Sequence, residues 1–158
     1  MLGLRLAASV LSGTLAAQAP AFTDQYTQRV GGAAQELAVV ARDFERQATA
    51  AGLTSQEALA RLTGAQDSFV AGHGADVART LARASWLQAH HRALTAPGPF
   101  RRFGAFTQGA DPDLVQGTWQ DYRPAIPTTT EGLGFAALGF LLVYAAPSLA
   151  VRRRRKSH

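Results

Sequence analysis

Two stretches without a charged residue lie near the two ends of the chain. They run from Leu6 to Thr23 and from Gly132 to Val151. At about 1.5 Å per residue the second stretch is about 30 Å long, the thickness of a bilayer's hydrocarbon core. It predicts a transmembrane helix over residues 129–151, with the Thr128-x-x-Glu131 spacing of a capping box at its start. The alternative is a helix buried in a soluble core.

The first uncharged stretch fits either a secretion signal or a permanent helix. Ala17 and Ala19 are the small residues that signal peptidase prefers. However, Pro20 would then be the first residue of the product, and proline lacks the N–H next to the scissile bond. We therefore expect no cleavage between Ala19 and Pro20, and a transmembrane helix over residues 1–22.

The region between these stretches has the apolar spacing of amphipathic helices. From residue 24 to residue 51, apolar side chains recur every three or four positions and predict one long helix. Gly31 and Gly32 mark either a bend or a close contact in it. A short helix follows, with a Thr54 and Glu57 capping box and Gly64 as its stop.

The second half of this region predicts a loop, a helix and two shorter segments. Residues 65–74 read as a loop because they contain two glycines. Asp76 then caps a helix through about Leu94, and a short segment surrounds Phe103 and Phe106. The Asp111-Pro112 pair opens a last helix, which ends before Pro124.

Small side chains recur at helical spacing in both uncharged stretches. Such faces let two helices approach closely. They predict a specific helix pair, within the chain or with a partner; the alternative is that small residues are simply common in an alanine-rich chain. The candidate packing residues are Ser9, Gly13, Ala17, Gly132, Ala136 and Gly139.

These elements together predict an all-α fold. Two transmembrane helices, N- and C-terminal, flank an exported antiparallel helical hairpin with short accessory helices. The expected domains are a membrane helix (1–22), a periplasmic helical region (23–128), a second membrane helix (129–151) and a basic cytoplasmic tail (152–158).

The charge is concentrated at the ends of the chain. The formal net charge is +5, yet residues 23–131 hold ten arginines against all eleven acidic residues. Basic residues beside an apolar span stay in the cytoplasm. We therefore expect an inner-membrane protein with both termini cytoplasmic and the middle periplasmic, and no nucleic acid as partner. The predicted membrane-anchoring tail consists of Arg152, Arg153, Arg154, Arg155 and Lys156.

Three segments resemble a known family. They are the junction APAFTDQYTQRVGG, the segment DPDLVQGTWQDYRPAIPTTTEG and the apolar span after it. They are similar to an uncharacterised family of proteobacterial inner-membrane proteins, domain of unknown function 2937. The resemblance implies two membrane helices around an exported helical region, and it implies no activity.

Candidate catalytic and metal-binding residues are few. His90 and His91 are adjacent, so on a helix they point about 100° apart and cannot share a metal. Asp111 and Asp113 are explained by the preference of a helix N-terminus for acids. The chain has no cysteine, nucleophile elbow, P-loop or dinucleotide motif. We expect no enzyme activity, no cofactor and no metal.

Aromatic residues follow the first span and precede the second. Together with two arginines they predict an interfacial belt that serves as a partner surface or only clamps the membrane helices. These residues are Phe22, Tyr26, Arg29, Trp119, Tyr122 and Arg123.

The predicted function is that of a non-catalytic accessory, scaffold or assembly subunit of a larger membrane complex. The expected partners are the lipid bilayer and another membrane protein or a second copy, and no small-molecule substrate is identified. The alternative is a membrane sensor or regulator with an exported helical ligand-binding region and a basic cytoplasmic tail.

Overall fold

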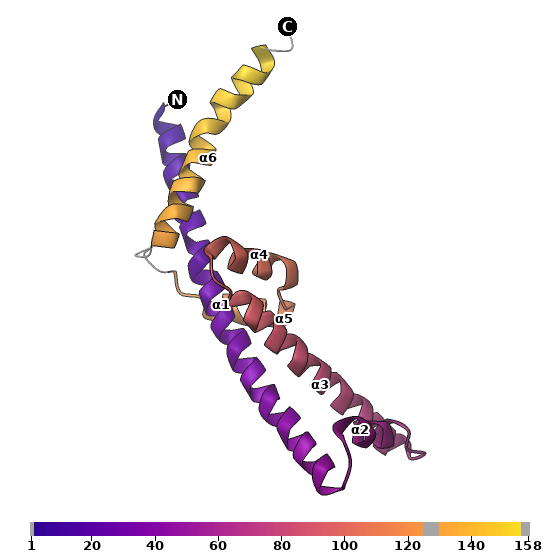
Figure 1. Ribbon diagram of the computed structural model, residues 1–158. Helices are drawn as coiled ribbons and strands as arrows, with labels where there is room; N and C mark the ends of the chain where they lie inside the picture. Colours follow the sequence, from indigo (N-terminus) through magenta and orange to yellow (C-terminus); the bar gives the residue numbers. More distant parts are fainter. Residues whose placement is uncertain (1, 125–129, 156–158) are drawn as a thin grey trace.

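The described part of the chain is entirely helical. The computed structural model describes residues 2–124 and 130–155, without the side chains of Leu2, Pro99 and residues 146–155. Within these ranges there are six α-helices and no strand, which confirms the all-α prediction (Figure 1). The helices are α1 (Leu2–Ala50), α2 (Ser55–Thr63), α3 (Ser68–Leu94), α4 (Pro99–Gly109), α5 (Pro112–Asp121) and α6 (Thr130–Arg155).

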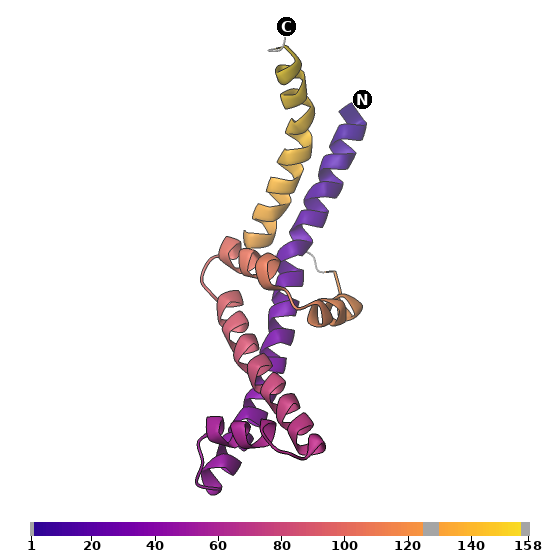
Figure 2. The same cartoon turned by 90° about the vertical axis from the view of Figure 1, so that its right-hand side faces the viewer.

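The helices form a two-helix arm and a helical body. Helix α1 runs through both, and α6 lies beside its N-terminal part (Figures 1 and 2). Helix α3 lies antiparallel beside the other part of α1, with α2 at the far end. We call α6 and residues 2–23 of α1 the arm, and the remainder the body. Helices α4 and α5 lie where the two meet.

No membrane-crossing helix is present in the described ranges. None of the helices there is both long enough and apolar enough to span a bilayer. The uncharged part of α1 is diluted by polar residues such as Ser9, Thr14 and Gln18. The prediction of two transmembrane helices is therefore wrong, and so is the predicted inner-membrane localisation with cytoplasmic termini and a periplasmic middle.

Helix α1 joins two predicted segments into one. The expected break after residue 22 is absent, and the helix continues for 49 residues with Pro20 inside it. An internal proline costs a helix about 3 kcal/mol. Packing of α1 against α6 on one side of Pro20 and against α3 on the other offsets that cost.

Local capping signals place the starts of the short helices. The predicted capping box of α2 is confirmed: the Thr54 N–H donates to Glu57 Oε2 at 2.8 Å, and the Glu57 N–H donates to Thr54 Oγ1 at 3.2 Å. Asp111 caps α5 as predicted. Thr128, the residue expected to cap α6, and Thr129, its expected first residue, lie outside the described ranges.

Helix α3 is longer than its sequence predicts. It begins at Ser68, with Asp67 rather than Asp76 as its N-cap, so the predicted loop at residues 65–74 is largely helix. Gly74 explains the error. A Cβ atom there would lie 2.7 Å from the Leu62 carbonyl carbon, so the glycine allows α2 to pack directly against α3.

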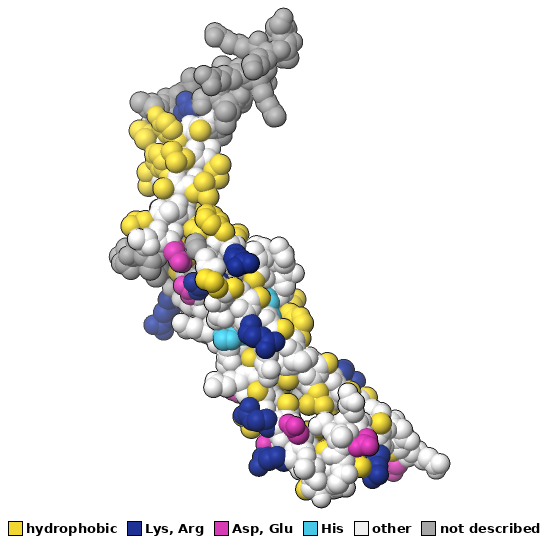
Figure 3. Space-filling model, viewed as in Figure 1, with side chains coloured by type: hydrophobic (Ala, Val, Ile, Leu, Met, Phe, Trp, Pro, Cys, Tyr) yellow, Lys and Arg dark blue, Asp and Glu magenta, His cyan; other side chains and the backbone are white. Residues whose placement is uncertain are grey.

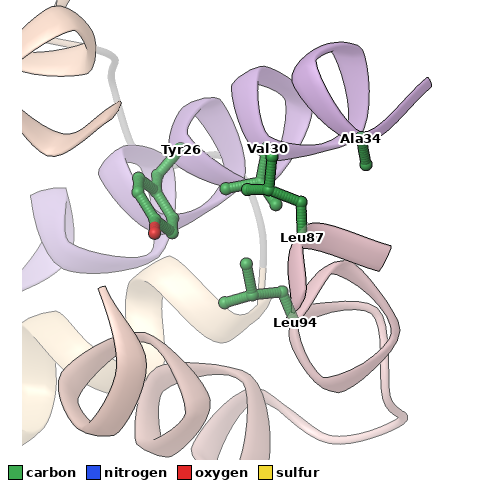
Figure 4. Close-up of a cluster of buried hydrophobic side chains, with 5 residues drawn as sticks. All are labelled: Tyr26, Val30, Ala34, Leu87 and Leu94. Atoms are coloured by element: carbon green, nitrogen blue, oxygen red, sulfur yellow. The ribbon is translucent and has the colours of Figure 1, made fainter. Parts of the chain in front are cut away.

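The body has a core of large apolar side chains. Tyr26, Val30 and Ala34 follow one another every four residues on α1 and face Leu87 and Leu94 of α3 (Figure 4). All except Ala34 are completely buried. Burial of such a side chain stabilises a fold by about 1.5–3 kcal/mol, so these contacts hold α1 and α3 together.

Candidate functional site

The arm brings together small residues from both of its helices. A Cβ atom at Gly13 would lie 2.8 Å from the Ala136 carbonyl oxygen, and one at Gly139 would lie 2.6 Å from Ala16 Cβ. The Ser12 hydroxyl donates to the Gly139 carbonyl oxygen at 3.0 Å. Of the predicted packing residues, Gly13 thus meets Ala136 directly, whereas Gly139 meets Ser12 and Ala16. Ser9, Ala17 and Gly132 are buried.

The outer surface of the arm is largely apolar where its side chains are described. Because the small residues face inward, the large side chains face outward, and they gather over the arm in Figure 3. Leu141 and Leu142 of α6 are 58% and 64% exposed. Contiguous apolar surface of this kind marks interaction sites in folded proteins.

An aromatic cluster lies where the arm meets the body. The Phe22 ring on α1 lies 5.4 Å from the ring of Tyr122 and 6.1 Å from that of Trp119, centroid to centroid. Its other neighbour is Phe106 of α4, at 5.9 Å. The Tyr122 hydroxyl donates to Gln18 Oε1 at 2.8 Å, which ties the end of α5 to α1.

An open groove of about 730 Å³ runs along this cluster. Trp119 forms part of its wall and is 71% exposed. The groove is lined by Leu15, Gln18, Ala19, Phe22, Thr23, Phe103, Phe106, Trp119, Tyr122 and Pro124. Its volume is in the range of small-ligand sites, and its apolar lining suits hydrocarbon or aromatic groups.

The remaining members of the predicted aromatic belt are placed differently from one another. Arg29 pairs with Asp121 across α1 and α5, and Arg123 is exposed beyond α5. Asp24 pairs with Arg102 of α4. Tyr26 does not belong to the surface, because it is completely buried in the body.

Tyr26 instead forms the centre of a buried polar cluster. Its hydroxyl oxygen accepts a hydrogen bond from the Asp111 backbone N–H at 2.8 Å and lies 3.1 Å from His90 Nε2. The two side chains share a hydrogen bond, whose direction depends on which ring nitrogen of His90 carries the proton. Asp111 Oδ1 caps α5, and its Oδ2 pairs with Arg83 at 2.9 Å. The cluster thus joins α1, α3 and α5.

Burial governs the ionisation of this cluster. Desolvation lowers the pKa of His90, and the nearby Asp111 carboxylate opposes that effect. Desolvation likewise raises the pKa of the Tyr26 hydroxyl. Both shifts favour the neutral forms, in which the Tyr26 hydroxyl can donate a hydrogen bond to His90 Nε2 when the imidazole carries its proton on Nδ1. The Trp86 ring stacks on His90 with 4.9 Å between centroids and covers it from outside.

The described residues hold no group of three or more His, Asp or Glu side chains that could bind a metal ion. The two adjacent histidines face different neighbours, as their 100° separation predicts. His90 faces Tyr26, whereas His91 faces Gly31, where a Cβ atom would lie 2.9 Å from His91 Nε2. Gly31 is therefore a close contact and not a bend.

Comparison with protein families identifies the chain. A family model described as "Protein of unknown function (DUF2937)" matches residues 2–157. The chain belongs to the DUF2937 family. The match does not extend to a proteobacterial inner-membrane character. No curated protein and no solved structure matches this DUF2937 protein.

Sequence reasoning missed the polar cluster of this DUF2937 protein. His90 lies three residues after Leu87 and four before Leu94, so helical periodicity places it on the buried face of α3. That spacing was the available signal. Its partners Tyr26 and Asp111 lie far away in the sequence, and no local pattern connects them to His90.

The predicted tail residues are described only in part. The backbone of α6 continues to Arg155, so Arg152–Arg155 extend a helix. Their side chains, and Lys156 altogether, lie outside the described part of the structure.

Proposed function

We propose that this DUF2937 protein acts without catalysis, as an accessory, scaffold or assembly subunit of a larger complex. The partner contacts the outer face of α6 with an apolar helix of its own. The observation that carries the proposal is the arrangement of side chains in the arm. Small residues lie between its two helices, whereas Leu141 and Leu142 face outward.

Two features of the fold support a scaffold. The body has its own core, so the arm is not needed to bury the side chains of α3. Arg102 of α4 also connects the body with the arm, because it pairs with Asp24 in the body and its Nη1 lies 3.8 Å from Glu131 of α6. A fixed arm presents its apolar face without first having to be ordered, which reduces the entropic cost of binding.

The experiment is quantitative affinity purification of the tagged chain under native conditions. The double variant Leu141→Gln/Leu142→Gln should lose a stoichiometric partner that the wild type retains. Phe69→Gln is the matched control, because Phe69 is 84% exposed but lies at the opposite end of the molecule, at the start of α3. A wild-type chain that purifies alone would contradict the proposal.

A second candidate function is regulation through a bound ligand. The groove beside Phe22 and Trp119 favours it, since its volume of about 730 Å³ would hold a small apolar molecule. Deletion of residues 152–158 separates the two candidates. Loss of a regulatory response with normal folding and normal partner binding would favour the regulator.

A further inference from the structure

A heptad pattern runs along the arm part of α1. Positions 4, 8, 11, 15, 18 and 22 are separated alternately by four and three residues, which is the a/d spacing of a coiled coil. None of these residues is charged. We call them the α1 seam: Leu4, Ala8, Leu11, Leu15, Gln18 and Phe22.

The N-terminal part of the α1 seam is not covered by α6. Helix α6 packs against Ser12 and Gly13, which lie on other faces of α1. The exposed fractions of Leu4, Leu11 and Leu15 are 79%, 61% and 65%. A coiled-coil seam with these exposures has room for a second helix.

The C-terminal part of the α1 seam enters the aromatic groove. Leu15, Gln18 and Phe22 line the groove from α1, and Trp119 and Tyr122 line it from the α5 side. A helix lying along the seam would therefore place its end among these aromatic rings. The groove gives the seam one open end and one end that accepts an apolar side chain.

We infer that the occupant is a second copy of this chain, with its own α1 seam packed antiparallel on the first. In this register Leu4 of each copy enters the groove of the other beside Phe22. Leu11 then faces Leu15 of the second copy, and every heptad a position of one copy faces a d position of the other.

Side-chain size favours the antiparallel arrangement over the parallel one. It sets Ala8 opposite Gln18 of the second copy, so Gln18 keeps its hydrogen bond from Tyr122. A parallel pair would instead set Gln18 against Gln18 and Phe22 against Phe22, where Trp119 already occupies the space beside Phe22.

The surface is large enough for a specific dimer. The exposed side chains of the seam, together with Trp119, present on the order of 500 Å² per copy. A symmetric pair then buries on the order of 1,000 Å², near the lower end of specific interfaces. The dimer uses α1, whereas the partner in the proposed function uses α6, so either can fail without the other.

Disulfide crosslinking tests the register directly, because the natural chain has no cysteine. Leu11→Cys and Leu15→Cys chains with tags of different size are mixed and oxidised. We expect the mixed dimer, which links position 11 of one copy to position 15 of the other, to predominate over both like-with-like dimers. Val10→Cys is the matched control, because Val10 is 58% exposed but lies off the seam; mixed with Leu15→Cys, it should give little dimer.

Sedimentation of the chain without cysteine provides the second measurement. Leu11→Gln should raise the dimer dissociation constant about a hundredfold, since symmetry removes two apolar side chains from each dimer. Leu142→Gln should leave the dissociation constant unchanged. Circular dichroism checks that both variants keep their helix content.

Three results would overturn the inference. A wild-type chain that sediments as a monomer at tens of micromolar would do so, as would like-with-like dimers in excess of the mixed one. The third is binding of the chain to phosphatidylcholine–phosphatidylglycerol vesicles through Leu11 and Leu15 with no crosslinking, which would assign the seam to a lipid surface.

Discussion

The arm and the body place opposite kinds of side chain between their helices. In the arm, Gly13 and Gly139 lie at the contact of α1 with α6, and leucines such as Leu142 lie outside. In the body, Leu87 and Leu94 lie between the helices and are completely buried. A single helix, α1, takes part in both arrangements along its length.

This difference shows that two distinct forces hold the same helix. The body is stabilised mainly by removing large apolar side chains from water. The arm is held by close backbone approach and dispersion, which require small side chains at the contact and leave the large ones available to another surface. Truncating a large side chain should therefore destabilise the body much more than the arm, whereas enlarging a small side chain at the helix contact should destabilise the arm.

The largest expected effect comes from truncating a leucine in the body. Leu87→Ala should lower the free energy of unfolding by about 2–5 kcal/mol, because it leaves a cavity between α1 and α3. Leu142→Ala makes the same chemical change on the arm, where the side chain is 64% exposed. It should cost less than about 0.5 kcal/mol. Urea unfolding measures both, and equal losses would contradict the comparison.

The reverse experiment enlarges a side chain in the arm. Gly139→Val should destabilise the α1–α6 contact by about 1–3 kcal/mol, because its Cβ atom would overlap Ala16. Gly134→Val is the control, since a Cβ atom at Gly134 meets nothing within 4 Å. Hydrogen exchange of the α6 backbone amides measures how readily α6 separates from α1 in each variant.

The body should remain protected in the Gly139→Val variant. Faster exchange throughout α3 as well would mean that the arm and the body unfold together. The two regions would then unfold as one cooperative unit, and the arm would have no unfolding free energy separate from that of the body.

The smallest expected effect is a pH dependence confined to the body. The pKa of His90 is lowered in the folded state, so the unfolded state binds more protons as the pH falls below about 6.5, the ordinary value for histidine. Stability should therefore be full above that pH and decrease below it. Each kcal/mol lost lowers the melting temperature by about 2–4 °C.

Thermal unfolding at a series of pH values measures this effect. His90→Gln should remove the part of the decline that begins near pH 6.5. His73→Gln should leave it intact, because His73 is exposed. An unchanged decline in the His90 variant would assign the pH dependence to other groups.

Much of the body could be predicted from its apolar spacing and caps. Val30 and Leu37 fall on the predicted stripe of α1, and Thr54 and Asp111 cap helices where their sequence motifs predict. These features depend on residues within one or two turns. Local patterns are sufficient for them.

Features that depend on distant residues could not be predicted in this way. Gly74 has the local signature of a loop, yet it lies inside α3 because α2 packs against it. Tyr26 was expected on a surface because it is aromatic and lies near a span. Its burial follows from His90 and Asp111, which are 64 and 85 positions away.

The uncharged stretches show a second limit of local reading. Their lack of charge was interpreted as membrane-crossing length, although length and apolar character must both be sufficient. Small residues lowered the apolar character of α1 while they created its contact with α6. The same glycines and serines therefore belong to stretches that were wrongly predicted to cross a membrane, and they form the contact of α1 with α6.

The unbroken course of α1 gives the molecule the geometry of a lever. Its 49 residues make a rod about 73 Å long. If the rod pivots near one end, a tilt of about 5° moves the opposite tip by about 6 Å. A partner that binds the arm is therefore connected to the far end of the body by one continuous helix, and any tilt of that helix would have to carry α3 with it, because Val30 is buried against Leu87 and Leu94.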